Sequence, residues 1–207
     1  MSAPWPSRRS IISIQLLTQL GVDLGLSLDR CLQETGLSPV QLSSLNGEIE
    51  AHRELQLIAN LVEALPAVAD LGLQAGRRYH VTSYGAWGYA ILSSATVRQA
   101  AELGLRYHGL TYAFTRISLS VDDTIANLNF DDSALPPRQH DFIVQEKHQL
   151  CAGDLPEPLA DLGQPALCPF CCRPLNYEVP GEPAPRPGPG VRASLLFLGG
   201  GLLNLAP

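Results

Sequence analysis

Residues 76–130 constrain the fold most, because the spacing of apolar residues changes within them. Over residues 97–110 apolar side chains recur at helical spacing. Over residues 112–121 and 125–130 they alternate with polar side chains, as in a strand with one buried face. The intervening Asp122-Asp123-Thr124 is typical of a turn. The sequence therefore predicts a helical segment followed by an antiparallel β-hairpin.

The chain before this stretch follows a helical period. Ser27 and Ser38 are expected to cap helices, with Pro39 in a first turn and Gly36 in a left-handed position at a helix end. Gly85 and Gly88 are expected to allow another element or a ligand to approach closely. The fold class predicted is α+β, with a helical amino-terminal half packed on a small antiparallel sheet. Helices are expected over residues 10–24, 27–36, 38–45, 50–65, 70–76, 84–94, 97–110 and 138–150.

The composition changes after about residue 150. Ten of the seventeen prolines lie between Pro156 and Pro189, and four of the five cysteines follow residue 150. Such a segment cannot bury enough apolar surface to offset its chain entropy. We therefore expect a folded domain over residues 1–150 and an irregular Pro/Gly/Cys-rich tail over residues 151–207. A divergent tail and a truncated or frame-shifted continuation both explain this texture.

Charge and apolar patterning favour no nucleic acid or membrane partner. The formal net charge is −6, which gives no bulk attraction to phosphate-rich surfaces. The sequence has no apolar run of about 18 residues and no signal-peptide pattern at its start. Five cysteines without a signal peptide suggest reduced thiols, and hence a cytoplasmic location.

No motif for catalysis or for a cofactor is found, so we expect a protein that is not an enzyme. His148 and Cys151, followed by Cys168 and Cys171, have a spacing that zinc modules use. The turn residues that such a module needs are poor here, and free thiols in a loose tail are the preferred interpretation. We expect no metal site.

The aromatic and basic side chains of residues 76–130 have the composition of a small-molecule pocket. An aromatic core with a polar rim has the same composition, and both interpretations stay open. Under the first, Arg116 or Arg78 would pair with a negatively charged head group, since a guanidinium matches a carboxylate with two parallel hydrogen bonds. The candidate ligand-binding residues are Arg78, His80, Trp87, Tyr89, Tyr107, Tyr112, Phe114 and Arg116.

Residues 32–55 contain two short helical segments joined by a glycine-containing turn, which resembles a helix-turn-helix. Its second helix, residues 39–45, carries no Lys or Arg, and Glu34, Glu48 and Glu50 surround it. DNA binding depends largely on cations that neutralise phosphates. The sequence therefore favours a packing hairpin over a DNA-reading element.

Residues 84–96, Tyr-Gly-Ala-Trp-Gly-Tyr-Ala-Ile-Leu-Ser-Ser-Ala-Thr, followed by Arg98-Gln99-Ala100, resemble a signature of one family. The family is that of AraC-type transcription regulators with an amino-terminal effector domain of the arabinose-binding type. The resemblance extends over about residues 10–150. It implies a small-molecule-sensing and self-associating half of a regulator, and nothing in these residues specifies a sugar as the effector.

The resemblance also sets the expected partners. It implies a small organic effector and a homodimer, or a heterodimer with an intact relative. The carboxyl-terminal domain with which this family reads DNA is not visible in the sequence, so we expect no sequence-specific DNA binding by this chain alone. The competing classes are a small enzyme or a lipid- or organic-acid-binding domain that uses the same pocket, and a nonfunctional truncated product.

Overall fold

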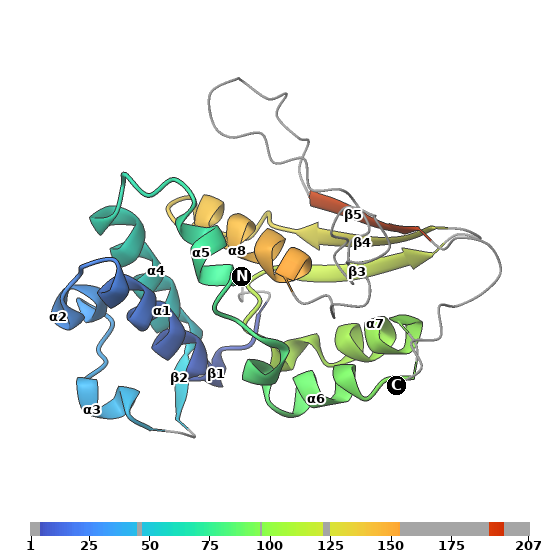
Figure 1. Ribbon diagram of the computed structural model, residues 1–207, viewed down its shortest axis with the longest axis horizontal. Helices are drawn as coiled ribbons and strands as arrows, with labels where there is room; N and C mark the ends of the chain where they lie inside the picture. The colour runs from blue at the N-terminus through green and yellow to red at the C-terminus, as the bar shows by residue number, and fades with distance from the viewer. Residues whose placement is uncertain (1–4, 45–46, 96, 122–124, 154–190, 197–207) are drawn as a thin grey trace.

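The computed structural model describes residues 5–44, 47–95, 97–121, 125–153 and 191–196. It confirms the α+β class: helices dominate the amino-terminal half and include a two-stranded sheet among them, and a three-stranded antiparallel sheet lies beside them (Figure 1). Within these residues no helix is both long enough and apolar enough to cross a membrane.

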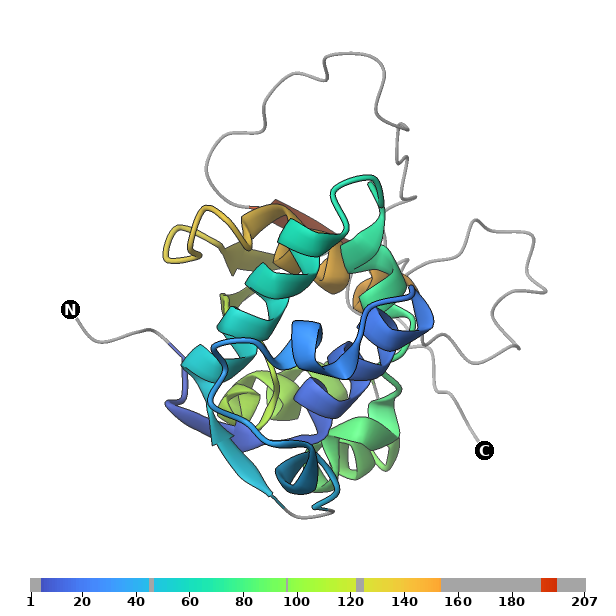
Figure 2. The ribbon, with the colours of Figure 1, turned by 90° about the vertical axis from the view of Figure 1, so that its left-hand side faces the viewer.

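The amino-terminal unit begins with a two-stranded sheet that the sequence analysis did not predict. Strand β1 (Arg8–Ser10) pairs antiparallel with β2 (Glu48–Glu50), placing Arg9 opposite Ile49. Figure 2 looks onto the helices of this unit. They are α1 (Ile12–Asp23), α2 (Leu28–Leu32), α3 (Pro39–Leu42) and α4 (Ala51–Ala64), of which α4 contacts β2.

Two of the expected helix starts are confirmed in detail. The Ser27 side chain accepts a hydrogen bond from the Arg30 amide, and Ser38 forms a capping box with Gln41. Helix α2 is shorter than expected, because Gln33 leaves the helical region with ψ 129°. The Thr35 hydroxyl then satisfies the Leu32 carbonyl at 2.7 Å, and Gly36 adopts the expected positive φ of 67°.

Helices α5 (Leu71–Gly76) and α8 (His140–Gly153) lie in close contact at the centre of the molecule. A Cβ atom added to Gly72 would lie 2.2 Å from the Phe142 carbonyl oxygen, so only glycine allows this approach. The Gln145 side chain bridges the two helices, accepting from the Gly72 amide and donating to the Ala69 carbonyl.

Helix α6 (Ala86–Leu92) follows a short 3₁₀ turn, η1 (Val81–Tyr84), and precedes α7 (Val97–Arg106) and a second 3₁₀ turn, η2 (His108–Leu110). Gly85 separates η1 from α6 with φ +55°, and no described atom lies within 4 Å of a Cβ built on it, so the close approach expected at Gly85 is wrong. A Cβ on Gly88 would meet the Val81 carbonyl at 1.8 Å, which confirms a close approach at that glycine.

The predicted hairpin is confirmed as β3 (Arg116–Val121) and β4 (Ile125–Asp131), with Arg116 opposite Asp131. The turn at residues 122–124 lies outside the described residues. Residues 112–115 do not belong to the strand, and all four are buried. They therefore form an inserted core segment that leads into β3.

The expectation that residues 151–207 are irregular throughout is wrong at two places. Helix α8 continues to Gly153, and β5 (Val191–Leu196) pairs antiparallel with β4. Cross-strand hydrogen bonding overrides the weak local pattern of this segment. Residues 154–190 and 197–207 lie outside the described residues, as do the side chains needed for a zinc site at Cys151, Cys168 and Cys171.

The apolar core joins the helical unit to the segment before β3. Its largest fully buried side chains come from α1, α4, α8 and residue 114: Ile14, Leu17, Leu20, Leu57, Ile58, Leu61, Phe114 and Ile143.

The contact of α5 with α8 gives a stability prediction. Gly72→Ala places a methyl group against backbone that cannot move freely, and we expect a loss of about 1–3 kcal/mol in the free energy of unfolding, as for overpacked cores. Urea unfolding followed by circular dichroism measures it. Gly109→Ala is the matched control, because its Cβ would meet only Pro6 at an ordinary 3.6 Å. Equal stability of both variants would contradict the close packing of α5 and α8.

Candidate functional site

A buried arginine marks the candidate site. On β1 the side chains alternate, and Arg9 points inward while its neighbour Arg8 remains exposed. The Arg9 side chain is 2% exposed. Its Nη1 donates to the Glu54 carboxylate at 3.3 Å and to the Tyr112 carbonyl at 2.9 Å. One side chain thus joins β1, α4 and the segment that precedes β3.

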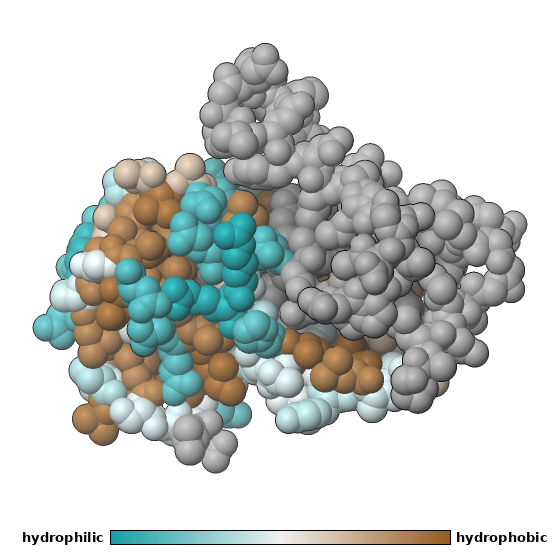
Figure 3. Space-filling model, viewed as in Figure 1, coloured by the Kyte–Doolittle hydropathy of each residue, from teal (hydrophilic) through white to brown (hydrophobic). Residues whose placement is uncertain are grey.

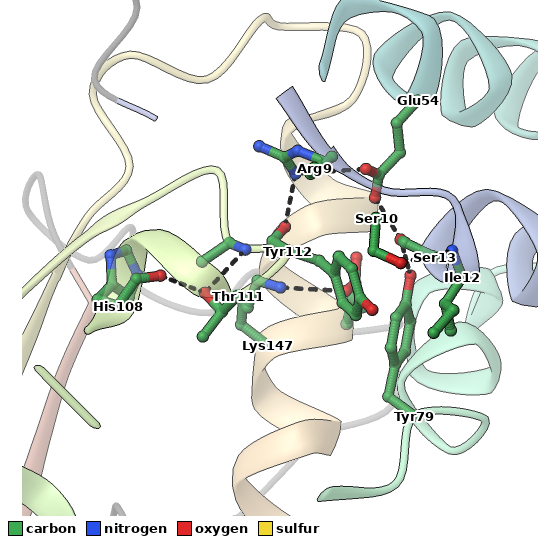
Figure 4. A network of polar contacts seen from close by, with 12 residues as sticks. Arg9, Ser10, Ile12, Ser13, Glu54, Tyr79, His108, Thr111, Tyr112 and Lys147 are labelled. Atoms are coloured by element: carbon green, nitrogen blue, oxygen red, sulfur yellow. Dashed lines mark hydrogen bonds and ion pairs between the residues drawn. The ribbon is translucent and has the colours of Figure 1, made fainter. Parts of the chain in front are cut away.

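Glu54 continues the polar network from α4 (Figure 4). Its second carboxylate oxygen accepts from the Ser13 hydroxyl of α1, and Ser13 Oγ lies 2.6 Å from the Tyr79 hydroxyl. Burial raises the pKa of Glu54 against the opposing effects of Arg9 and Ser13. Burial also raises the pKa of Tyr79 well above its usual value, with nearby Glu146 adding to the effect. The phenol of Tyr79 therefore stays protonated and available as a donor.

A second group of charges approaches from α8. Lys147 lies 3.1 Å from the Glu146 carboxylate, and both side chains are largely buried. The pKa of His108 is lowered, first by burial and then by the positive charges of Lys147 and Arg9. The imidazole of η2 thus lies within electrostatic range of two cations and is held neutral at pH 7.

Several buried polar atoms of this region lack a hydrogen-bond partner within the part of the chain that the structure describes. They are Nε and Nη2 of Arg9, Nε2 of His108 and Oγ1 of Thr115. A buried donor without a partner costs about 1–3 kcal/mol, and such groups are rare in native structures. Among the described residues, the unsatisfied atoms on Arg9 and His108 are therefore the strongest sign of a ligand site.

Aromatic side chains enclose the arginine and the residues beside it. The guanidinium carbon of Arg9 lies 4.0 Å from the centre of the Phe114 ring, and Trp5 packs edge-on against the same ring. Tyr112 packs against Tyr84 with ring centres 5.0 Å apart, and Tyr84 in turn contacts Trp87 at 5.3 Å. These are apolar walls next to a small number of polar groups, the usual composition of a ligand site.

Three of the predicted site residues belong to these walls: Trp87, Tyr112 and Phe114. Trp87 is partly fixed by its indole N–H, which donates to the Gly104 carbonyl at 3.2 Å. Tyr112 is fixed by its hydroxyl, which donates to the Ser83 carbonyl at 2.8 Å. The predicted pocket and the alternative aromatic core therefore share these side chains.

The other predicted site residues lie nearer the surface. Arg78 forms an ion pair with Asp23 at 2.7 Å, and Arg116 is exposed at the start of β3. Tyr89 and Tyr107 are 64% and 50% exposed. His80 is also exposed, and its backbone amide donates to Ser83. The structure therefore does not bring these five side chains into the buried network.

Five residues of this network were not among those predicted from the sequence: Arg9, Ser13, Glu54, Tyr79 and His108. One signal was available at Glu54, because this acid shares a helical face with Ile58 and Leu61. A carboxylate on an apolar face needs a buried partner. No local pattern identifies that partner as Arg9, which lies 45 residues away.

No described group of three or more His, Cys, Asp or Glu side chains is arranged to hold a metal ion. The site instead offers hydrogen-bond donors, a buried acid and aromatic surfaces. This chemistry suits the binding of a polar organic molecule.

Comparison with known proteins decides the family. The family described as "Arabinose-binding domain of AraC transcription regulator, N-term" matches residues 25–153, which is more than half of the chain. The chain belongs to this family of AraC-type effector domains. The resemblance found in residues 84–96 is thereby confirmed.

Curated relatives of this AraC-type domain are transcriptional regulators. HTH-type transcriptional regulators of Mycobacterium tuberculosis (strain H37Rv) and Mycobacterium bovis (strain AF2122/97) are each 26% identical over 144 residues. That alignment covers 69% of this chain and 41% of each relative. The ornithine utilization regulator of Pseudomonas aeruginosa is 29% identical over 119 residues, covering 58% of this chain and 35% of the relative. The aligned region is thus well under half of each regulator.

The ion pair of the AraC-type domain gives a second stability prediction. Arg9→Met leaves Glu54 buried without its cation, and we expect a loss of about 3–5 kcal/mol in the free energy of unfolding. The double variant Arg9→Met/Glu54→Leu removes both charges and should recover part of that loss. A double-mutant cycle in urea measures the coupling.

The neighbouring pair Arg8–Glu48 is the control for this cycle, since its side chains are 64% and 62% exposed. Arg8→Met should cost no more than about 1 kcal/mol. If the double variant at positions 9 and 54 lost the sum of the two single losses, the pair would not be energetically coupled.

Proposed function

We propose that this AraC-type domain senses a small organic molecule by reversible binding and so regulates transcription. The observation that carries the proposal is the buried network of Arg9 and Glu54 with unsatisfied donor atoms beside an aromatic wall. A core that only needed stability would be better served by apolar side chains of similar volume. Membership in an effector-domain family supports the same conclusion.

The effector would be of modest size and would contact Trp87, Tyr112 and Phe114. The Pseudomonas relative is named for ornithine utilisation, which supports an organic metabolite as the class of effector. We do not extend ornithine itself, or arabinose, to this chain. Arg78 and Arg116 remain proposed contacts, and each requires its side chain to reorient from the position described above.

Self-association is part of the proposal. The structure exposes Tyr89 and Leu92 of α6, and Tyr107 and Leu110 beyond the end of α7. Figure 3 shows hydrophobic surface along the α6–α7 layer. A second copy of this domain, or the corresponding domain of a relative, would cover these side chains. Since the relatives are transcriptional regulators, we expect the dimer to act in the cytoplasm.

The competing proposal is a small enzyme or a lipid- or organic-acid-binding domain. Ser13, Glu54 and Tyr79 form a hydrogen-bonded chain that resembles an acid–base relay, and this is the observation in its favour. Ser13 is fully buried and both of its neighbours are engaged in the network, which favours a structural role. Conversion of a bound compound, followed by mass spectrometry, would establish the enzyme.

The test of effector sensing is a thermal-shift screen of metabolites, both charged and neutral, with the full chain. A true effector should raise the melting temperature saturably and leave the compound unchanged. Trp87→Ala and Arg116→Ala should weaken that shift more than they lower the melting temperature without the compound. Truncating a core aromatic side chain lowers the free energy of unfolding by about 3–5 kcal/mol. If Trp87→Ala unfolds the domain outright, Trp87 is such a core residue and its binding role loses its support.

The helical hairpin of α2 and α3 gives a prediction about DNA. Helix α3 is a single turn, none of its residues is buried, and it carries no cation. We therefore expect no sequence-dependent retardation of DNA by the described domain in a gel-shift titration at low salt, where phosphate contacts are strongest. Tight, sequence-dependent retardation that is lost on changing Gln41 to Ala would instead make this hairpin a DNA-reading element.

A further inference from the structure

We infer that Arg9 and His108 form a buried subsite for the carboxylate of an organic acid. This inference names the chemical class of the effector, and it rests on the proposed sensing function. It adds an arginine at the centre of the domain to Arg78 and Arg116, the anion contacts that the sequence suggested.

The bonds that Arg9 already makes define the free edge of its guanidinium. Both protein partners, the Glu54 carboxylate and the Tyr112 carbonyl, are reached by Nη1. The atoms left without a partner are Nε and Nη2. These two nitrogens lie on one edge of the planar group, and their N–H bonds are nearly parallel. A carboxylate fits that edge with two hydrogen bonds, whereas an ether, an alcohol or a single water satisfies at most one of them well.

The free edge is held in place before any ligand arrives. The guanidinium lies against the Phe114 ring, 4.0 Å from its centre, and Trp5 supports that ring from its edge. Glu54 holds the opposite end, and Glu54 is itself held by Ser13. Binding therefore costs little side-chain entropy, which is the main advantage of a preorganised site.

The charges facing the subsite allow a carboxylate to enter. Arg9 and Lys147 are balanced by Glu54 and Glu146, and the neutral His108 adds no charge. A new anion would favour protonation of His108, whose Nε2 has no partner, and that proton would supply a third donor.

The probes are small acids with neutral isosteres: butyrate against butyramide, and benzoate against benzamide. Each is titrated into the full chain at constant ionic strength, and Trp fluorescence and calorimetry report binding. Such small ligands bind with Kd values of roughly millimolar order. We expect each acid to bind saturably and at least about tenfold more tightly than its amide, the difference of a charge-assisted pair of hydrogen bonds.

The variant Arg9→Lys keeps a positive charge for Glu54 but has no two-nitrogen edge. It should weaken acid binding by about tenfold or more, because an ammonium cannot reproduce the fork. The matched control is Arg53→Lys, at a partly exposed arginine that pairs with Glu50 and lies outside the subsite. It should bind the acids as the unchanged chain does.

The variant His108→Phe tests acid binding without disturbing the fold at Arg9, because it leaves the Arg9–Glu54 ion pair in place. It should weaken acid binding at least about threefold, by loss of one hydrogen bond to a charged group. If Arg9→Lys fails to fold, this variant and the acid–amide comparison still decide the matter.

Three results would overturn the inference: amides that bind as tightly as acids, acids whose affinity is unchanged in Arg9→Lys, or no saturable binding of either acid. Inorganic phosphate that binds more tightly than both acids would also overturn it, in favour of an oxyanion site. A neutral effector found in the metabolite screen would leave the sensing function intact while removing the carboxylate subsite. The two proposals therefore fail separately.

Discussion

The buried ion pair between Arg9 and Glu54 is the interaction on which the rest of this structure depends. It joins a strand at the start of the chain to α4 and, through the Tyr112 carbonyl, to the segment that leads into β3. Two charges in a core are costly unless each keeps its full set of hydrogen bonds. Glu54 keeps its set through Ser13, but Arg9 does not, because Nε and Nη2 remain without partners. The hydrogen bonds of the ion pair are thus complete at Glu54 and incomplete at Arg9.

That asymmetry gives the proposed sensing function a physical basis. A ligand that completes the hydrogen bonds of Arg9 would bind a side chain that also contacts Glu54 of α4 and Tyr112 in the segment before β3. When a buried residue that contacts several elements changes its hydrogen bonds, the positions of those elements can change together. Figure 4 shows this convergence, with His108 and Lys147 on the side opposite Ser13 and Tyr79. Regulation by such a domain needs no chemical step, only a different affinity for its conformations.

Local signals in the sequence predicted much of this fold. Caps at Ser27 and Ser38 placed two helices, and alternation placed the hairpin of β3 and β4. The signals failed where long-range pairing decides the structure: β1 and β2 have three residues each, and β5 joins β4 from far along the chain. At the site, Trp87, Tyr112 and Phe114 were named from composition as candidate ligand contacts, and that role stays a prediction, since the structure shows only their aromatic packing. Arg9 was not named, because its role depends on Glu54, a partner that lies 45 residues away in the sequence.

The most direct test of the account is the NMR signal of the Arg9 Nε–H group, assigned by its loss in Arg9→Lys. The buried, weakly solvated proton should be visible, and saturating titration with an acid that binds the chain should shift it downfield together with the His108 ring signals. Signals of exposed arginines such as Arg8 should not move. Binding of the acid that leaves the Arg9 signal unchanged, while other parts of the domain respond, would contradict the claim that this buried arginine is where the domain senses its effector.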